Sequence, residues 1–509
     1  MFGALLDARD RYGRDQKALE DPERSPLTYA RLVLGALILG RKLAAITAPG
    51  ETVGVLLPNM QVVAVVLFAL NAHGRVPAML NFTGGVKNLR AACELASIRT
   101  LLTSRRFIEL AKLDDVINVL SVGRRILFIE DARAGITSVD KARGVAASLM
   151  PRRAVARAGV QPDHPGVILF TSGSEGLPKG VVLSNANLVA NAAQVAAHAG
   201  SALTTADKLF IPLPVFHVFG LTGLLLGLLH GVKVVLYPTP LHYREVPRLI
   251  RATGATILLA TDFFLQGYAR AAEEGDLRSI RYVIAGGERV QDETRRLWAR
   301  TGITILEGYG ATECMISCNL PDRNRPGTVG PFLPGIAWKL EPVEGIHEGA
   351  RLCVSGPNMM LGYIAGDGSF EAPAGGFHDT GDIVSVRDGF VIIRGRAKRF
   401  AKIGGEMVSL AAVESLAQGL WPESIHAAVA LPDRRKGEQI VLVTEKDAAD
   451  REALVARGRA QGLPELWLPR AVLVAPIPVI GSGKIDYPAI AEMVRRLISD
   501  RPLSRAPTI

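Results

Sequence analysis

The run Thr171-Ser-Gly-Ser-Glu-Gly-Leu-Pro-Lys179-Gly180 combines hydroxyl side chains, glycines and one lysine. It directly follows an apolar stretch at 166–170, and a segment with helical periodicity follows at 185–198. Glycines let the backbone curl so that its N–H groups face an anion, while the hydroxyls and the lysine add further donors. The run therefore predicts a phosphate-binding loop suited to a triphosphate. It is not a Walker A loop, because Gly180 follows Lys179 where that loop has Ser or Thr.

Six further short runs combine glycines with polar or aromatic residues. They are Pro212-Leu-Pro-Val-Phe-His217, Ala285-Gly-Gly-Glu288, Glu307-Gly-Tyr-Gly-Ala-Thr-Glu313, His378-Asp-Thr-Gly-Asp382, Gly395-Arg-Ala-Lys398 and Pro478-Val-Ile-Gly-Ser-Gly-Lys484-Ile-Asp486. With the first run, they follow the order of the motifs of the adenylate-forming superfamily, which includes acyl-CoA synthetases, luciferases and peptide-synthetase adenylation domains. The chain resembles this superfamily over roughly residues 30–490. One departure is His378, where members usually have an aromatic residue.

The resemblance implies ATP as a substrate and Mg²⁺ as a cofactor. The residues implied in ATP binding are Thr171, Ser172, Gly173, Ser174, Lys179, Gly286, Gly287, Glu288, Tyr309, Asp382 and Arg396. Tyr309 would place its ring beside adenine, and Asp382 would accept hydrogen bonds from both ribose hydroxyls. The glycines of the 285–288 turn would let a flat base approach the backbone.

The catalytic residues that the resemblance implies are Lys484, His217, Thr312 and Glu313. Glu313 would also hold Mg²⁺, because a cation that bridges phosphates needs few protein carboxylates. The charge of the reactants supports the role of Lys484. Adenylation joins two anions, a carboxylate and a triphosphate, so it needs screening and positioning more than proton transfer. A lysine flanked by glycines on a moving domain can be delivered and then withdrawn, and the resemblance places the hinge at Lys398.

The acyl pocket of this superfamily corresponds here to a set of aromatic residues, Phe216, Phe219, Phe263 and Phe264. Among these residues there is no obvious Asp or Arg to hold a second polar group of an amino acid, which favours a fatty or aromatic acid. Each buried CH₂ contributes about 0.8 kcal/mol, so an apolar tunnel would select long chains. The thiol acceptor would enter beside a loop that contains Lys402, Gly404, Gly405 and Glu406.

Three longer stretches, 236–244, 324–330 and 395–410, resemble the synthetase half of the bifunctional acyl-ACP synthetase/2-acylglycerophosphoethanolamine acyltransferases, and the chain also resembles long-chain fatty acyl-CoA synthetases. This implies acyl carrier protein (ACP) as the acceptor, with CoA as the alternative. None of the nine histidines has Asp five positions later, so the H-x-x-x-x-D motif of the acyltransferase half is absent and we expect a stand-alone synthetase. Two rival interpretations remain: an enzyme that stops at acyl-adenylate or uses an amine, and a non-enzymatic binding module.

The charge balance agrees with anionic partners. Lys and Arg exceed Asp and Glu by 59 − 49 = 10, and the sequence pI is about 9.5. No dense basic run has interleaved aromatic residues, so no nucleic-acid partner is expected. The basic cluster at 434–436 is a candidate docking site for the acidic carrier protein, although such a cluster is more often a solvated loop.

The elements that must position these residues follow an α/β pattern. Strand-like runs alternate with helical segments up to about residue 320, as in doubly wound sheets, whose ligands bind at the carboxyl ends of strands. A β-rich subdomain is expected at 320–395 and completes an N-terminal adenylation domain of residues 1–395. A small, mobile α+β domain would then occupy 396–509, with its hinge near Lys398.

The apolar stretches 52–72 and 219–236 each contain polar residues, so we interpret them as buried core segments, not membrane spans. The first fifteen residues become charged at once and do not resemble a signal peptide. A cytoplasmic protein is therefore expected, with peripheral contact at the inner membrane left open. The four cysteines do not suggest a disulfide framework. Cys314 and Cys318 are expected on one helical face, as small buried residues.

Overall fold

A computed structural model describes the chain. The described residues are 1–172, 178–346, 348–365, 369–403, 406–433, 437–479 and 485–500, without the side chains of residues 154, 172, 398 and 498–500. The chain forms two compact units. Unit 1 comprises Met1–Ala337 and Ser355–His378, and unit 2 comprises Trp338–Val354 and Asp379–Ile509. The boundary expected between the adenylation domain (1–395) and the mobile domain (396–509) concerns motion of one domain against the other, and it stays a prediction.

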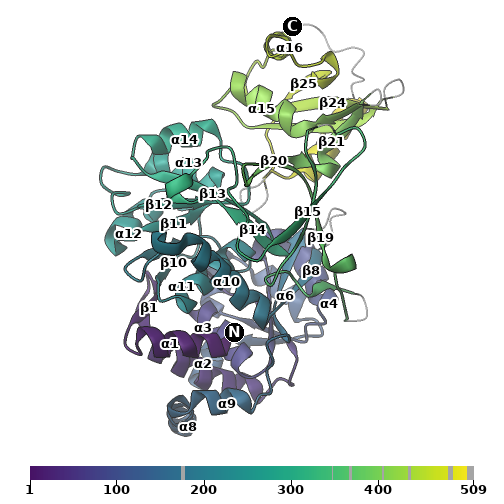
Figure 1. Cartoon of the computed structure of the whole chain (residues 1–509). Coiled ribbons are helices and arrows are strands. Elements are labelled where there is room, and N and C mark those ends of the chain that lie inside the picture. The colour runs from purple at the N-terminus through teal and green to yellow at the C-terminus, as the bar shows by residue number, and fades with distance from the viewer. Residues whose placement is uncertain are drawn as a thin grey trace. The chain divides into compact units, whose positions relative to one another are not determined.

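The first sheet of unit 1 has the strand order β14-β13-β12-β11-β9-β10-β1-β2 (Figure 1). Its parallel strands are β1 (Lys17–Asp21), β9 (Lys208–Ile211), β10 (Lys233–Leu236), β11 (Ile257–Ala260), β12 (Tyr282–Ala285) and β13 (Thr304–Ala311). β2 (Arg24–Thr28) and β14 (Cys314–Cys318) pair antiparallel at the two edges. The helices between these strands are α11 (Val218–Leu229), α12 (Glu245–Thr253), α13 (Asp262–Ala271) and α14 (Asp292–Ala299).

The second sheet of unit 1 has the order β18-β17-β8-β7-β4-β3-β5-β6. The strands are β3 (Thr52–Val55), β4 (Val76–Met79), β5 (Thr100–Thr103), β6 (Arg125–Phe128), β7 (Pro165–Ser172), β8 (Pro178–Ser184), β17 (Gly362–Ile364) and β18 (Phe370–Glu371). The remaining helices of unit 1 are α1 (Phe2–Tyr12), α2 (Tyr29–Ala44), α3 (Gln61–Ala72), α4 (Gly85–Leu95), α5 (Arg105–Ala111), α6 (Asp114–Ser121), α7 (Ile129–Ala134), α8 (Ser138–Leu149), α9 (Pro151–Ala156) and α10 (Asn185–Ala199).

The two long apolar stretches form the centre of unit 1. The first folds as β3 and α3, and the second as α11 and β10, with nearly every residue of both helices buried. A helix that is apolar on all sides is stable only inside a core, and one continuous cluster of buried side chains includes both helices. Among the described residues, no helix combines the length and apolar character needed to cross a bilayer.

Unit 2 contains two antiparallel-rich sheets. The first has the order β15 (Ala337–Glu341), β16 (Ala350–Ser355), β19 (His378–Arg387) and β20 (Phe390–Arg396). The second contains β22 (Glu406–Ser409), β21 (Phe400–Ile403), β24 (Gly437–Thr444) and β23 (His426–Asp433), with β25 (Ala471–Val474) parallel to β24. The helices are α15 (Leu410–Leu420), α16 (Arg451–Ala460) and α17 (Tyr487–Asp500). The predicted fold class, α/β followed by β-rich and α+β segments, is confirmed.

One local prediction was wrong. Cys314 and Cys318 lie on strand β14, not on a helix, because this segment pairs antiparallel with the end of β13. The same pairing includes the last four residues of β13, from Gly308 to Ala311. All four cysteines are buried and free, as expected of small core side chains.

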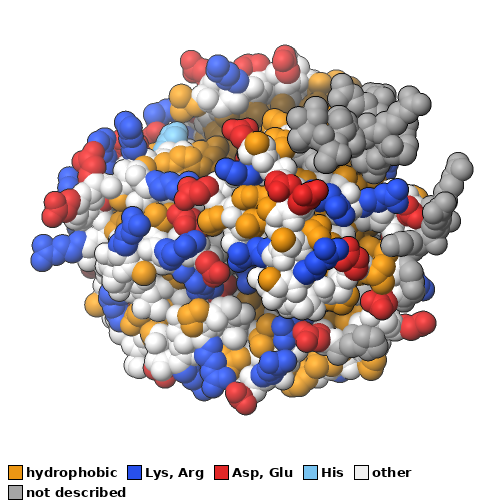
Figure 2. Space-filling view, turned by 90° about the horizontal axis from the view of Figure 1, so that it is seen from above, with side chains coloured by type: hydrophobic (Ala, Val, Ile, Leu, Met, Phe, Trp, Pro, Cys, Tyr) orange, Lys and Arg blue, Asp and Glu red, His pale blue; other side chains and the backbone are white. Residues whose placement is uncertain are grey.

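The charged side chains on one face of the molecule are of mixed sign. On the face shown in Figure 2, Lys and Arg side chains are interspersed with Asp and Glu, and neither sign forms a large continuous area. Interspersed charges of this kind favour solubility and do not define a partner. The net charge alone therefore does not locate a binding site for an anionic partner, and particular residues must identify it.

Candidate active site

The base of the predicted phosphate loop is a hairpin. β7 and β8 pair antiparallel so that Thr171 is opposite Lys179 and Ser172 is opposite Pro178. The loop between them, with the predicted Gly173 and Ser174, lies outside the described residues, as does the side chain of Ser172. The hairpin thus brings a hydroxyl and a cation to the same end of two strands, which suits an anion held between them.

Thr312 and Glu313 form the two-residue turn between β13 and β14, where Ala311 pairs with Cys314. Gly310 is required beside this turn, because a Cβ there would lie 2.9 Å from the Cα of Met315. Glu313 is buried, and Thr312 is partly buried. Tyr309 is also buried and pairs with Ser317 on β14. One hairpin therefore positions three of the predicted site residues.

Tyr363 connects this turn to the phosphate-loop hairpin. Its hydroxyl donates a hydrogen bond of 2.6 Å to Oε1 of Glu313. The Nζ of Lys179 lies 5.0 Å from the centroid of the Tyr363 ring, within the range of a cation–π interaction. Burial, and then the neighbouring Glu313 carboxylate, raise the pKa of Tyr363, so the phenol stays protonated and acts as a donor. Tyr363 belongs to none of the sequence motifs, and its partners are remote in the sequence.

The predicted adenine-binding turn follows β12 and is tied to helix α13. Gly287 has a φ of +87°, a conformation that glycine adopts without strain. Oε1 of Glu288 accepts a hydrogen bond of 2.9 Å from the backbone N–H of Phe263, in the first turn of α13. A carboxylate at a helix N-terminus is favourable because unpaired N–H groups and the helix dipole converge there. Glu288 therefore fixes the turn, and its Oε1 is already engaged by a backbone N–H group.

Two predicted sub-sites meet at Gly286. A Cβ at this position would lie 3.1 Å from Cε1 of Phe219 and 3.5 Å from the carbonyl oxygen of Gly308. Phe219 belongs to the predicted acyl pocket, while Gly286 and the 307–313 segment belong to the predicted nucleotide site. Residues predicted for the acyl pocket and for the nucleotide site thus lie in contact, as a reaction between a carboxylate and ATP requires.

The other predicted acyl-pocket residues differ in their surroundings. His217 is the N-cap residue of α11, and its ring centroid lies 4.6 Å from that of Phe216. Phe216 is buried and packs edge-to-face against Phe82. Phe263 is partly exposed, whereas Phe264 is fully buried and stacks on Tyr268. Phe219 and Phe263 are therefore more accessible than the other two phenylalanines.

Glu307 is a buried carboxylate for which the sequence analysis gave no role. It forms an ion pair with Arg295 and accepts hydrogen bonds from the backbone N–H groups of Val290 and Gly327, at 3.3 and 3.1 Å. The pair joins β13 to α14 and to the loop after the adenine turn. A buried ion pair of this kind costs several kcal/mol when one partner is removed. Glu307 therefore acts by holding the turn in place.

In unit 2, Asp382 and Arg396 are cross-strand neighbours on β19 and β20. The Nε of Arg396 lies 3.2 Å from Oδ1 of Asp382, and the Asp382 side chain is 6% exposed against 69% for Arg396. The two residues predicted to bind ribose and phosphate thus share one site. Lys398 follows within Ala397–Arg399, although its side chain lies outside the described residues.

The predicted hinge is followed directly by a partly buried group of contacts in unit 2. Arg399 pairs with Glu414 at 2.8 Å, and its guanidinium lies 3.4 Å from the ring centroid of Tyr487. Tyr487 is the first residue of α17 and also donates to Glu414 at 3.4 Å. These contacts join the first residues after the hinge to the segment that follows Lys484. Lys484 itself lies outside the described residues.

The predicted thiol-acceptor loop is the end of the β21–β22 hairpin. Lys402 and Glu406 are exposed there, and the backbone N–H of Lys402 donates to Oε2 of Glu438 at 2.6 Å. Gly404 and Gly405 lie outside the described residues, as do Arg434, Arg435 and Lys436. The described residues of this loop are accessible to solvent, and the role of the loop in binding the thiol acceptor stays a prediction.

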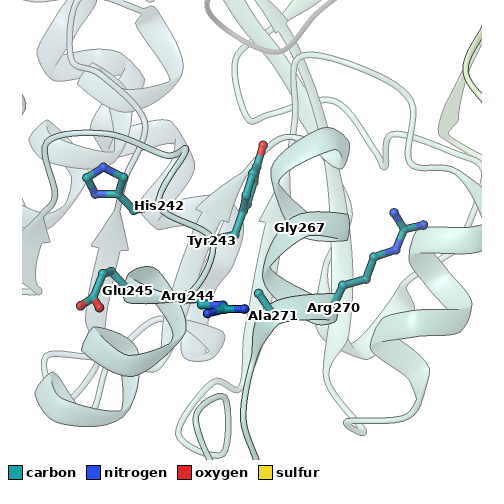
Figure 3. A pocket seen from close by; sticks show the side chains of 7 residues that line it. All are labelled: His242, Tyr243, Arg244, Glu245, Gly267, Arg270 and Ala271. Carbon is teal, nitrogen blue, oxygen red and sulfur yellow. The ribbon is translucent and has the colours of Figure 1, made fainter.

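A surface hollow lies between α12 and α13 (Figure 3). It has a volume of about 700 Å³ and is lined by His242, Tyr243, Arg244, Glu245, Gly267, Arg270 and Ala271. Tyr243 lies against Gly267, where a Cβ would be 2.2 Å from its Cδ1. Its ring is also 6.4 Å from that of Phe263. The hollow therefore adjoins the predicted acyl pocket through Tyr243.

The described residues contain no metal site built from several protein ligands. Within the described ranges, no three His, Cys, Asp or Glu side chains come together as they would to hold a metal ion. Mg²⁺ bound to phosphates takes most of its ligands from phosphate oxygens and water, so one or two carboxylates are sufficient. Glu313, whose Oε1 is oriented by Tyr363, fits that requirement.

Comparisons with known proteins agree with these motifs. The profile of the family described as "AMP-binding enzyme" matches residues 6–364. A feruloyl-CoA synthase of Amycolatopsis sp is 27% identical over 90% of this chain and 92% of its own length. A long-chain-fatty-acid–CoA ligase of Salmonella typhimurium is 32% identical over 55% of this chain and 53% of its own. ATP-bound MatB of Rhodopseudomonas palustris superposes with a TM-score of 0.83 at 24% identity, over 97% of this chain and 99% of that one, which shows a shared fold.

Proposed function

The chain belongs to the AMP-binding enzyme family, as its motifs predicted, and we propose that it joins a fatty acid to the phosphopantetheine thiol of ACP at the expense of ATP. In the first half-reaction, a carboxylate oxygen attacks the α-phosphorus, the bond to the bridging oxygen breaks, and pyrophosphate leaves. In the second, the thiolate sulfur attacks the acyl carbon and AMP leaves. The resemblance to solved structures concerns the fold, so the substrate and the acceptor are proposals.

The observation that carries the adenylation proposal is the contact of Lys179, Tyr363 and Glu313. It places a cation and an oriented carboxylate between the phosphate-loop hairpin and the Thr312 turn. Thr171, Lys179 and Thr312 would hold phosphate oxygens, and fixed donors that match the transition-state charge are the main source of catalysis in such reactions. Mg²⁺, held by Glu313 and the phosphates, would neutralise phosphate charge when bound. His217, Tyr309, Asp382 and Arg396 would position the two substrates, and Lys484 would screen their charges.

A fatty acid is supported by the apolar surroundings of Gly286. Helix α11, which carries Phe219, has no charged residue among its twelve. An acyl chain gains free energy with every CH₂ it buries there. The fatty-acid ligase among the relatives supports the same class of substrate, while the feruloyl-CoA synthase is a reason to include aromatic acids in the test.

The acceptor proposal rests on the charge of one cluster in the sequence. ACP is strongly acidic, and the 434–436 cluster offers three basic residues. CoA is the second candidate, favoured by the names of the relatives described above. In either case, the predicted mobile domain of residues 396–509 would turn about Lys398 between the half-reactions and present the Lys402–Glu406 hairpin to the thiol. Charge reversal of Arg434 and Arg435 should raise the KM for ACP at low salt, and an unchanged KM would contradict docking at this cluster.

Two assays test the proposal. ATP–pyrophosphate exchange should depend on a medium- or long-chain fatty acid, and exchange that follows only aromatic acids would contradict the substrate. No exchange with any acid would favour a binding module. Thioester formation with purified fatty acid should then be compared between phosphopantetheinylated ACP and CoA. Product on CoA alone would replace ACP with CoA as the acceptor, and adenylate release without thioester would point to an enzyme that stops at the first half-reaction.

A further inference from the structure

Helix α8 presents apolar side chains to the solvent. Val139, Ala142, Ala146 and Leu149 recur at intervals of three and four residues, so they lie along one side of the helix. Val139 is 55% exposed and Leu149 is 71% exposed. Large apolar residues beside this stripe, Val145 and Met150, are also about half exposed, at 49% and 57%. The outward side of α8 is therefore apolar where a surface helix is normally polar.

The opposite side of α8 is anchored to α2. Gly144 is buried, and a Cβ there would lie 2.2 Å from Cγ1 of Ile38. Asp140 pairs with Lys42 on α2 at 2.7 Å. A capping box formed by Thr137 and Asp140 begins the helix. These contacts fix the rotation of α8, so the exposure of its apolar side is set by packing and is not a consequence of fraying.

Most basic side chains around this stripe lack acidic partners among the described residues; the exception is Arg152, which pairs with Asp7 and Asp10. Lys141, Arg143, Arg153 and Arg157 are all exposed, and none forms an ion pair with another described residue. The acidic residue of the helix, Asp140, is already neutralised by Lys42. This arrangement differs from the interspersed charges of the face in Figure 2. The segment 139–157 thus combines exposed apolar residues with uncompensated positive charge.

We propose that the α8–α9 segment, residues 139–157, is a docking surface for an anionic phospholipid membrane. Apolar side chains at such a surface enter the boundary between headgroups and acyl chains, while arginines contact lipid phosphates. Figure 1 shows α8 and α9 together at an outer end of unit 1, beside α2 and away from the sheets. A symmetric contact between two copies is disfavoured, because it would bring the same basic residues against each other. The surface would hold the protein where fatty acids partition, yet it does not depend on the proposed activity.

Co-sedimentation of the full chain with phosphatidylcholine vesicles, with and without phosphatidylglycerol, tests this surface. We expect binding only to the vesicles that contain the anionic lipid, and weaker binding at high salt. Leu149→Glu should weaken binding by about tenfold, because it removes apolar area and adds a repelled charge. Arg153→Ala and Arg157→Ala should each weaken it by about fivefold.

Matched controls come from the same unit. Leu110 is 70% exposed near the end of α5, so Leu110→Glu makes the same change at equal exposure elsewhere. Arg300 is exposed beyond α14, and Arg300→Ala removes one charge there. Both should bind like the wild type, with unchanged thermal unfolding. Equal weakening by the controls, binding unaffected by Leu149→Glu, or self-association without vesicle binding would each overturn the proposal.

Discussion

The hydroxyl of Tyr363 donates a 2.6 Å hydrogen bond to Oε1 of Glu313. The two residues lie fifty positions apart and come from β17 and from the turn between β13 and β14. Because burial and the adjacent carboxylate raise the pKa of Tyr363, the phenol remains a donor at neutral and moderately alkaline pH. The bond therefore holds the predicted Mg²⁺ ligand in one orientation while leaving its second oxygen for other contacts.

Tyr363→Phe should lower kcat/KM for fatty-acid-dependent ATP–pyrophosphate exchange by about ten- to a hundredfold, since hydrogen bonds to charged groups contribute about 1.5–3 kcal/mol. The Mg²⁺ concentration needed for half-maximal rate should rise as well. Tyr282→Phe is the control, because its hydroxyl contacts only the exposed Arg281 among the described residues. Exchange with unaltered rate and Mg²⁺ dependence would show that the bond does not orient Glu313.

Gly286→Ala should affect substrate use more than stability. The added Cβ would lie 3.1 Å from Cε1 of Phe219, so the ring must move by a few tenths of an ångström. We expect a loss of about 1–3 kcal/mol in unfolding free energy, as for other overpacking changes, and a shift of the acid preference toward shorter chains. Gly3→Ala, where nothing lies within 4 Å, is the control. An unchanged preference for acyl chain length would contradict the prediction that Phe219 lines the acyl pocket.

Arg396→Ala should raise the KM for ATP by about tenfold without lowering the unfolding temperature appreciably. The Arg396 side chain is 69% exposed, and exposed ion pairs contribute little to stability. Asp382→Asn should raise the same KM, because an amide is a weaker acceptor for ribose hydroxyls than a carboxylate. Arg387→Ala, at the exposed end of β19, serves as the control. Normal KM values in both variants would remove this pair from the nucleotide site.

The sequence allowed the motif turns and the α/β class to be predicted because both depend on local order. Glycines at 286, 287 and 310 mark positions where the backbone bends or approaches another strand closely. Tyr363 and Glu307 could not be found in this way, since their partners are brought in by distant strands. The spacing of four between Cys314 and Cys318 puts the two side chains on one face of a helix and equally on one face of a strand. The pairing with β13 makes this segment a strand, and that pairing is not visible in the local sequence.

Acid should destabilise the protein through four buried or partly buried histidines. Burial lowers the pKa of His73, His198, His230 and His426 below the ordinary 6.5. Below about pH 6.5 the unfolded chain therefore binds more protons than the folded chain. The stability that the neutral histidines contribute to the folded state is fully present above about pH 6.5 and is lost as the pH falls through the folded pKa values. The unfolding temperature should decrease from about pH 7 to about pH 5.

His198 offers a specific test of this dependence. Its Nε2 lies 2.8 Å from the carbonyl oxygen of Cys318, which can only accept, so the neutral ring donates there. His198→Gln keeps a donor but cannot be protonated, and should flatten the decrease of the unfolding temperature between about pH 7 and about pH 5. His164→Gln, at an exposed position, should leave the decrease unchanged. An equally steep decrease in both variants would contradict a role for His198.

Lys484→Ala should separate the two half-reactions. Adenylation brings a carboxylate against a triphosphate, and without a lysine to screen them the repulsion raises the barrier, so acyl-adenylate formation should fall by at least about a hundredfold. Thioester formation from synthetic acyl-adenylate involves no such approach of two anions, and should keep most of its rate. Lys446→Ala, an exposed lysine of unit 2, should leave both unchanged. Equal loss in both half-reactions of Lys484→Ala would instead mean that this lysine supports the fold of unit 2 or takes part in both steps, and the proposed alternation about Lys398 would lose its main support.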